Sequence, residues 1–394
     1  MSKNDEENEN KVIEDSNDID KASNDFDYGL NEINRLNIIK DQAVKAVEDG
    51  DGFTEREAKM ADVSLEHIYR RLHYKKPVSR PSLENYKSEN IKLETTKRLV
   101  VSLEADEKTL WGKFKAFCLK IWNMIVDMLR SLFSSIDKTK KKADDLHQEI
   151  NSITGKTPTV KTFRNDNIFR AFFFNDDEVK ISTLVSLLEL QRKETKSIME
   201  NLGNLVISIT DTTEKYLTQS KNAVDLNKLN LEYKDDLVKL TNDFLSNIST
   251  IQVYHKEYKI GPFVNNRCVV FNIGVDGKLI SNWQEFIKLS GKIELDLPVL
   301  NDSEMKNIYK AVIELLDDTK RSKEYIDRFG KAIKDITNDK SWNSQPNSIP
   351  KEIYSDTMVI INAMNKMSNA LPTLNLVASS KALTYIEDSL EFYK

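Results

Sequence analysis

The sequence predicts a mainly α-helical protein: a long-helix bundle with a small β-hairpin module, preceded by a disordered acidic N-terminus. Three observations support this fold class. The 394 residues include only 11 glycines and 8 prolines, so few residues interrupt a helix. The charged fraction of 31% is high and the hydrophobic fraction of 39% is low, as in long helices with polar outer faces. Apolar residues recur every three or four positions over long segments, which indicates amphipathic helices.

The N-terminal third of the chain is acidic and contains only modest helical patterns. Residues 1–25 have few apolar side chains, so we expect them to be disordered. Helices are expected over residues 26–47 and 54–72, because a glycine-rich segment follows the first and two prolines follow the second. A further helix is expected to begin near Ser82.

The most regular amphipathic pattern spans residues 110–136. Its apolar side chains form one stripe on a helical period. The residues assigned to this apolar stripe are Trp111, Phe114, Phe117, Ile121, Trp122, Ile125 and Leu129. The opposite face is mainly basic, and a lysine cluster follows over residues 138–142. Packing in a core or against a partner is the favoured interpretation; the alternative is an interfacial helix over residues 107–136 that lies on a membrane or docks on a partner.

The remainder of the chain predicts long helices with one β insertion. The helices are expected over residues 177–220, 225–256, 303–338 and 351–392. Residues 268–273 and 278–280 are mainly apolar and flank a Gly-Val-Asp-Gly segment, which is typical of a β-hairpin. We therefore divide the chain into three regions. These are an acidic leader with short helices (1–104), an amphipathic helix with a basic linker (105–156), and a helical body (157–394) with the hairpin insert near 262–298.

The segments that resemble cofactor-binding and metal-binding motifs lack residues that those motifs require, and no catalytic motif stands out. Residues 153–157 resemble the end of a phosphate-binding loop, but Ile150 stands where that loop requires glycine. The acidic segment around Gly52 lacks carboxylates at the first and last positions of a calcium loop. His67 and His73 are six residues apart and do not share a helix face as zinc ligands. We expect no enzymatic activity, no cofactor, no metal and no small-molecule substrate.

Targeting and redox signals point to an intracellular protein. Cys118 and Cys268 are far apart in sequence, and we expect both to be reduced. The acidic N-terminus lacks the apolar core of a signal peptide, and the chain has no apolar run of about 18 residues. We therefore expect no membrane-spanning segment.

The segment Ser102-Leu103-Glu104-Ala105 stands where the acidic part of the chain gives way to the Trp-, Phe- and Lys-rich helix. This order of parts resembles the internal head and virion structural proteins of large tailed phages, especially giant phages of the phiKZ type. In those families a prohead protease removes N-terminal propeptides by cutting after glutamate in Ser-x-Glu-like motifs. The resemblance implies a processing site at Ser102, Leu103, Glu104 and Ala105.

The resemblance also implies a non-enzymatic virion protein that is made in the host cytoplasm and packaged inside the capsid. Its partners would be other virion proteins and a prohead protease, and non-specific contact with packaged DNA is left open. Membrane contact is the less favoured alternative. Ser-Leu-Glu also occurs at 64–66, 82–84 and 389–391, and Ser102 has an alternative structural role as a helix N-cap.

Overall fold

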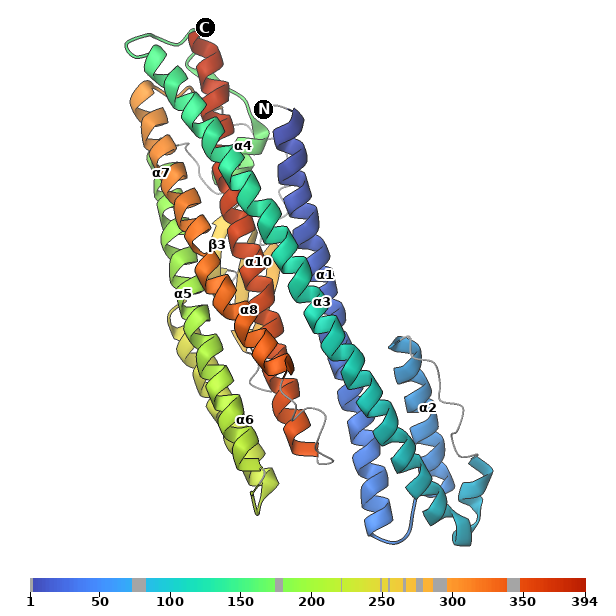
Figure 1. Ribbon diagram of the computed structural model, residues 1–394. Coiled ribbons are helices and arrows are strands. Elements are labelled where there is room, and N and C mark those ends of the chain that lie inside the picture. The colour runs from blue at the N-terminus through green and yellow to red at the C-terminus, as the bar shows by residue number, and fades with distance from the viewer. Residues whose placement is uncertain are drawn as a thin grey trace. The chain divides into compact units, whose positions relative to one another are not determined.

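The structure is a computed structural model that describes residues 3–72, 83–173, 180–220, 222–248, 250–253, 256–264, 267–273, 279–285, 296–338 and 348–394. The chain divides into two compact units. The larger unit contains residues 1–20, 122–339 and 346–394, and the smaller unit contains residues 21–121 and 340–345. Two of the points where the chain passes from one unit to the other fall inside long helices. These helices are α1 (Lys3–Glu48) and α3 (Glu89–Ser152) (Figure 1).

Long helices build the larger unit, so the predicted mainly α fold is confirmed. Besides parts of α1 and α3, they are α5 (Ile181–Ser220), α6 (Leu226–Ser246), α7 (Asp302–Arg321), α8 (Lys323–Asn338) and α10 (Ser348–Leu390), with the short α4 (Asp166–Phe172) and the 3₁₀ turn η2 (Glu391–Tyr393). Helix α10 contacts α4, α5, α6 and α7. Between Asp356 and Leu376 nearly every described side chain of α10 is buried, as expected for a helix enclosed by others.

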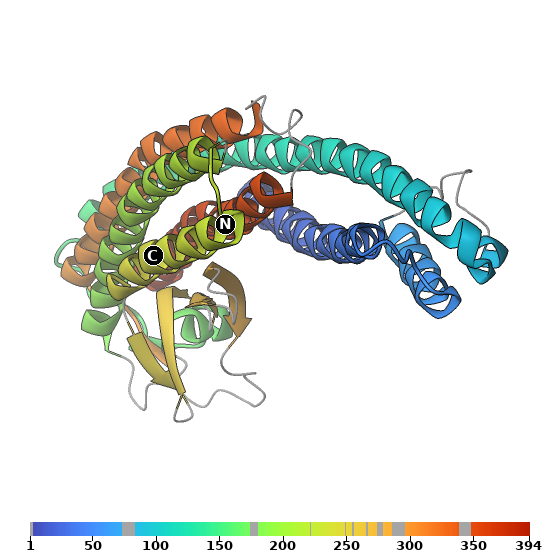
Figure 2. The same ribbon diagram turned by 90° about the horizontal axis from the view of Figure 1, so that it is seen from below.

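The predicted β module is a four-stranded antiparallel sheet. Its strands follow the order β2 (Thr250–Val253), β3 (Lys256–Val264), β4 (Arg267–Ile273) and β5 (Leu279–Glu285). Strands β4 and β5 form the predicted hairpin, with Ile273 opposite Leu279, while its turn lies outside the described residues. The sheet lies on one side of the helices, beside α5, α6 and α10 (Figure 2). A separate pair joins β1 (Thr162–Phe163) to β6 (Leu297–Pro298).

The predicted helix over residues 225–256 is too long. Helix α6 ends at Ser246, and Thr250–Val253 forms β2, which pairs with β3. The physical reason is a change in side-chain type, because this segment is rich in β-branched residues that favour strands. Apolar spacing alone did not separate the two elements.

The predicted helix over residues 303–338 is divided into α7 and α8 at Ser322. The Ser322 hydroxyl donates a hydrogen bond of 2.6 Å to the carbonyl of Thr319. The backbone N–H of Ser322 also bonds to the last turn of α7. A serine that bonds to the preceding turn competes with regular helix bonding, which explains the break.

The N-terminus departs from the expectation of disorder over residues 1–25, because α1 begins at Lys3. Val12, Ser16 and Ile19 are buried, and their spacing places them on one face of the helix. In the larger unit the side-chain amide of Asn369 donates a hydrogen bond of 3.1 Å to the carbonyl of Ser16. A few well-spaced apolar residues thus pack an otherwise acidic segment against α10.

The smaller unit contains residues of α1 and α3 together with α2 (Glu55–Arg71) and the 3₁₀ turn η1 (Leu83–Lys87). The predicted helix over residues 54–72 is confirmed, and Thr54 and Glu57 form a capping box at its start. Gly52 has a φ of +69°, and a Cβ atom there would lie 2.8 Å from the Cα atom of Leu93. The turn between α1 and α2 therefore requires glycine to approach α3.

Trp122 of α3 packs directly on the backbone of α8 in the larger unit. Its side chain is buried. A Cβ atom built on Gly330 would lie 2.1 Å from the Trp122 ring. Since an indole ring cannot bend away from such an overlap, only glycine at position 330 permits this contact.

Gly330→Ala should therefore destabilise the larger unit by about 1–3 kcal/mol through overpacking, although alanine is the better helix former. Gly112→Ala is the matched control, because a Cβ atom at this exposed helical position meets nothing within 4 Å. The control should stabilise its helix by about 0.5–1 kcal/mol. Denaturant unfolding followed by circular dichroism measures both changes, and stabilisation by both substitutions would contradict the described packing.

Candidate functional site

The Ser102-Leu103-Glu104-Ala105 segment lies inside α3, which begins upstream at Glu89. Ser102 is therefore not an N-cap, and the alternative structural role considered for it is wrong. The helix continues upstream because buried positions recur there at helical spacing: Thr96, Leu99, Leu103, Asp106 and Leu110.

Exposed and buried side chains alternate closely around the Glu104–Ala105 peptide bond. Glu104 and Ala105 are exposed, whereas Leu103 is 0% exposed. The next residue after Ala105, Asp106, is buried, and its carboxylate accepts a hydrogen bond of 2.5 Å from the hydroxyl of Tyr69 in α2. The predicted processing segment thus presents its glutamate to solvent from a helix that is held in the core of the smaller unit.

The other Ser-Leu-Glu segments have different surroundings. Glu66 is exposed on α2. Ser389 and Leu390 are buried at the end of α10, and the Ser389 hydroxyl accepts a hydrogen bond of 3.3 Å from the backbone N–H of Leu300. Ser82 lies outside the described residues.

Residues of the apolar stripe occur in both units. In the smaller unit, Phe117 is half-buried and stacks on Phe26 with ring centroids 6.2 Å apart. The buried members of the stripe are Ile121 in the smaller unit and Trp122, Ile125 and Leu129 in the larger unit. Trp111 and Phe114 belong to α3, but their side chains lie outside the described part of the structure.

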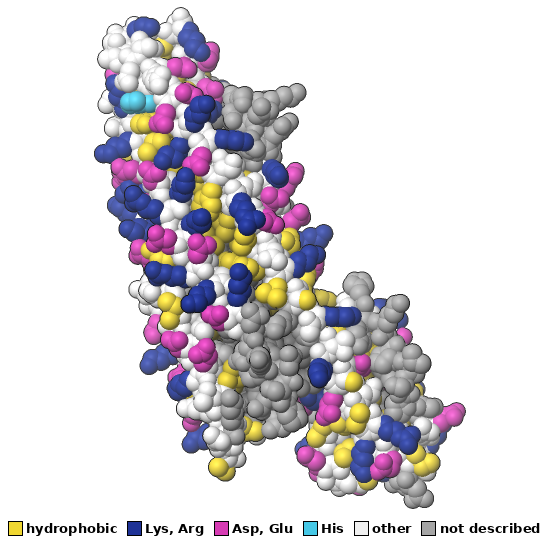
Figure 3. Space-filling view, in the orientation of Figure 1, with side chains coloured by type: hydrophobic (Ala, Val, Ile, Leu, Met, Phe, Trp, Pro, Cys, Tyr) yellow, Lys and Arg dark blue, Asp and Glu magenta, His cyan; other side chains and the backbone are white. Residues whose placement is uncertain are grey.

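Two of the four lysines in the cluster after the stripe form ion pairs between helices. Lys140 binds Asp317 of α7 and Lys142 binds Glu387 of α10, each with an N–O distance of 2.6 Å. Burial alone would raise the pKa of Glu387, but the net shift is downward, and the Lys142 ammonium makes the largest lowering contribution. Lys138 and Lys141 remain exposed. On the face in Figure 3, basic and acidic side chains are interspersed, so this face is not a continuous cationic surface.

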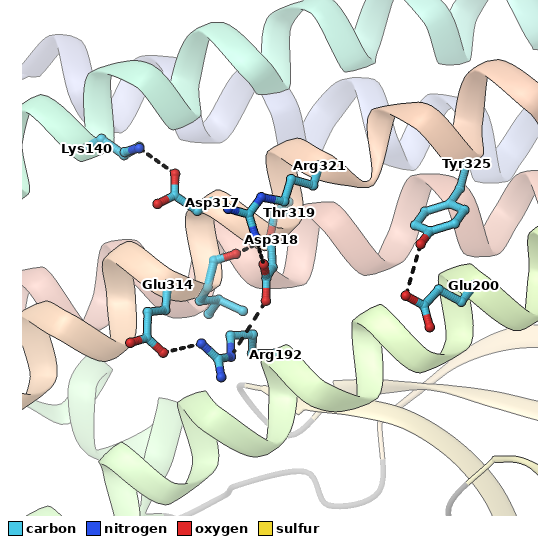
Figure 4. A network of polar contacts seen from close by, with 10 residues as sticks. Lys140, Arg192, Glu200, Glu314, Asp317, Asp318, Thr319, Arg321 and Tyr325 are labelled. Carbon is cyan, nitrogen blue, oxygen red and sulfur yellow. Dashed lines mark hydrogen bonds and ion pairs between the residues drawn. The ribbon is translucent and has the colours of Figure 1, made fainter.

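A second polar cluster joins α5 to α7 and α8 (Figure 4). Arg192 of α5 forms ion pairs with Glu314 and Asp318 of α7, the latter with an N–O distance of 3.7 Å. Further along α5, Glu200 accepts a hydrogen bond of 3.0 Å from the hydroxyl of Tyr325 in α8. These residues were missed by the sequence analysis, because solvated helix faces carry the same residue types.

A buried amide node lies where α5, α7 and α10 meet. The side-chain oxygen of Asn375 accepts hydrogen bonds from Gln191 at 2.9 Å and Thr195 at 3.2 Å. Its side-chain NH₂ donates to the hydroxyl of Thr319 at 2.8 Å. All these side chains are buried, and the node satisfies polar groups from each of the three helices. Its signal in the sequence is an asparagine within the apolar segment 371–376, which was overlooked.

A tyrosine node links α5, α6 and α10 elsewhere in the larger unit. Tyr233 is fully buried, and its hydroxyl lies 2.5 Å from the hydroxyl of Thr357. It also donates a hydrogen bond of 3.2 Å to the carbonyl of Ile353. Burial raises the pKa of Tyr233, so the phenol stays protonated and acts as a structural donor.

Potential metal ligands are not clustered in the described part of the structure. Among them, no group of three or more His, Cys, Asp or Glu side chains is arranged to hold a metal ion. His67 lies on α2, and His73 lies outside the described residues. Within the same part of the chain, no helix combines the length and apolar character needed to span a bilayer.

Comparison with known families identifies the chain. A family model described as phiKZ-like phage internal head proteins matches residues 7–393. The chain belongs to this family. The protein is therefore a structural component of the virion and is located inside the phage capsid. No curated protein and no solved structure matches it.

The amide node should contribute measurably to the free energy of unfolding of this internal head protein. Asn375→Ala should lower the free energy of unfolding by about 2–4 kcal/mol, because it leaves buried donors and an acceptor without partners. Asn201→Ala is the control, since among the described residues that half-buried side chain bonds only to Ser197 of its own helix, at 3.5 Å. The control should change the free energy by at most about 0.5 kcal/mol. Equal effects in chemical denaturation would show that the node does not stabilise the bundle.

Proposed function

We propose that this internal head protein is a non-enzymatic structural protein whose residues 1–104 form a removable leader. A prohead protease would cut the Glu104–Ala105 bond, and residues 105–394 would remain in the capsid. The observation that carries this proposal is the Ser-Leu-Glu-Ala segment with an exposed Glu104 in a chain of this family. The protein would be made in the host cytoplasm and packaged inside the capsid head after proteolytic removal of the leader.

The contacts of the helical body are compatible with loss of the leader. The amide node at Asn375, the tyrosine node at Tyr233 and the ion pairs of Arg192 all join elements on the C-terminal side of Glu104. Cleavage would remove the hydrogen bond between Asn369 and Ser16, together with the apolar contacts of α1. The mature chain would thus keep its central polar nodes and gain newly exposed surface on α10.

We assign the apolar stripe of α3 a packing role and not a membrane role. Burial of Ile121 in the smaller unit, and of Trp122, Ile125 and Leu129 in the larger unit, supports this assignment. The fit of Trp122 against Gly330 supports it further, because such contacts are typical of a close-packed interior. A membrane-associated or partner-docking helix over residues 107–136 is the alternative, and it would require these side chains to leave their present contacts.

The partners that fit this role are other virion proteins and the prohead protease. The exposed Lys138 and Lys141 are suited to weak, salt-sensitive contact with packaged DNA. Their neighbours Lys140 and Lys142 are occupied by carboxylates of α7 and α10, which limits the charge available for such a contact. We therefore place assembly with proteins ahead of DNA binding.

Intact mass and N-terminal sequencing of the chain from purified virions test the processing proposal. The chain should begin at Ala105. Glu104→Gln should leave the N-terminal region attached, because the substrate would lack the glutamate after which the protease cuts. Glu66→Gln is the matched control and should mature normally at Ala105. Virions that contain only the full-length chain, or that mature at Ala105 in spite of Glu104→Gln, would overturn the proposal.

A further inference from the structure

The backbone around Glu104 is not in a form that a protease can bind. Proteases commonly engage their substrates as extended segments that form main-chain hydrogen bonds. Here the scissile bond lies within the continuous helix α3, so its N–H and C=O groups are used inside the helix. Exposure of the Glu104 side chain is therefore insufficient for cleavage, and the local helix must open first.

Contacts within the smaller unit oppose this opening on both sides of the bond. On the N-terminal side, Leu103 is fully buried, and the hydroxyl of Thr96 accepts a hydrogen bond of 2.8 Å from the backbone N–H of Phe53. On the C-terminal side, Asp106 accepts the hydrogen bond from Tyr69. An extended segment centred on Glu104 would withdraw both Leu103 and Asp106 from the core.

Tyr69, which donates the hydrogen bond to Asp106, is held in position by burial and by the contacts of α2. Tyr69 is 2% exposed and lies near the end of α2. Two residues later, Arg71 forms an ion pair of 2.8 Å with the buried Glu32 of α1. Helix α2 is thus joined to α1 through Arg71 and to α3 through Tyr69, so the hydrogen bond to Asp106 connects the scissile segment to the rest of the unit.

We propose that the hydrogen bond between Tyr69 and Asp106 controls protease access to the Glu104–Ala105 bond. While it is intact, the scissile segment stays helical and is cleaved slowly. Its loss, when the smaller unit opens or has not yet folded, makes the segment available. This inference rests on the proposed processing for its biological meaning, but the restraint itself is a property of the folded chain.

Limited proteolysis of the full-length chain with a glutamate-specific endopeptidase tests the restraint without the phage protease. Tyr69→Phe keeps the buried ring and removes only the hydroxyl. If cleavage follows the population of the locally open form, the rate at Glu104 should rise about 10-fold. Asp106→Asn retains an oxygen that can accept the bond, so its rate should lie between those of the natural chain and Tyr69→Phe.

Tyr325→Phe is the matched control. It removes a tyrosine–carboxylate hydrogen bond of 3.0 Å, that to Glu200, in the larger unit. It should leave the rate at Glu104 unchanged. Circular dichroism should give the same helical content for all variants. If Tyr69→Phe does not fold, the cleavage rate at Glu104 in Asp106→Asn is compared with that of the natural chain: a faster rate supports the inference, and an unchanged rate overturns it.

An unchanged rate at Glu104 in Tyr69→Phe, or an equal rise in Tyr325→Phe, would overturn the inference. So would cleavage of the natural folded chain at Glu104 as fast as that of the urea-unfolded chain. These results are independent of the N-terminus found in virions. A full-length chain in virions would overturn the processing proposal and leave the measured restraint in place.

Discussion

Helix α10 is enclosed by α4, α5, α6 and α7 and by the β-sheet, and this enclosure constrains the rest of the larger unit. A helix buried on nearly every side has no solvated face on which a poorly packed side chain could be tolerated. Its neighbours supply apolar contacts and, at Asn375 and Thr357, hydrogen-bond partners for polar side chains. The N-terminal part of α1 contributes to the same enclosure, since the carbonyl of Ser16 accepts a hydrogen bond from Asn369.

The polar side chains of α10 provide specificity that apolar packing alone would not. Asn375 bonds to α5 and α7, and Thr357 lies 2.5 Å from the hydroxyl of Tyr233 in α6. A helix shifted by one turn would retain much of its apolar contact but would leave these groups without partners. We interpret the nodes as the feature that fixes the register of the bundle, with ion pairs such as that of Lys142 and Glu387 at its edge.

Elements with a local signal could be predicted from the sequence, and those set by distant contacts could not. The helix over residues 54–72 was predicted from the prolines that follow it, and the hairpin of β4 and β5 from the apolar segments beside Gly-Val-Asp-Gly. Each of these signals acts within a few residues. The extent of α3 was missed because burial of Leu103 and Asp106 depends on α2 and other parts of the smaller unit. The amide node was missed for the same reason: Asn375 is polar, and nothing near it in sequence identifies its partners.

We propose that the apolar stripe of α3 packs inside the protein and does not bind a membrane. Hydrogen exchange of the full-length chain, with and without anionic lipid vesicles, tests it most directly, because buried helices exchange slowly. We predict that residues 121–150 are strongly protected in the absence of vesicles and that adding vesicles leaves this protection unchanged. Rapid exchange over these residues that slows only when vesicles are added would contradict the account.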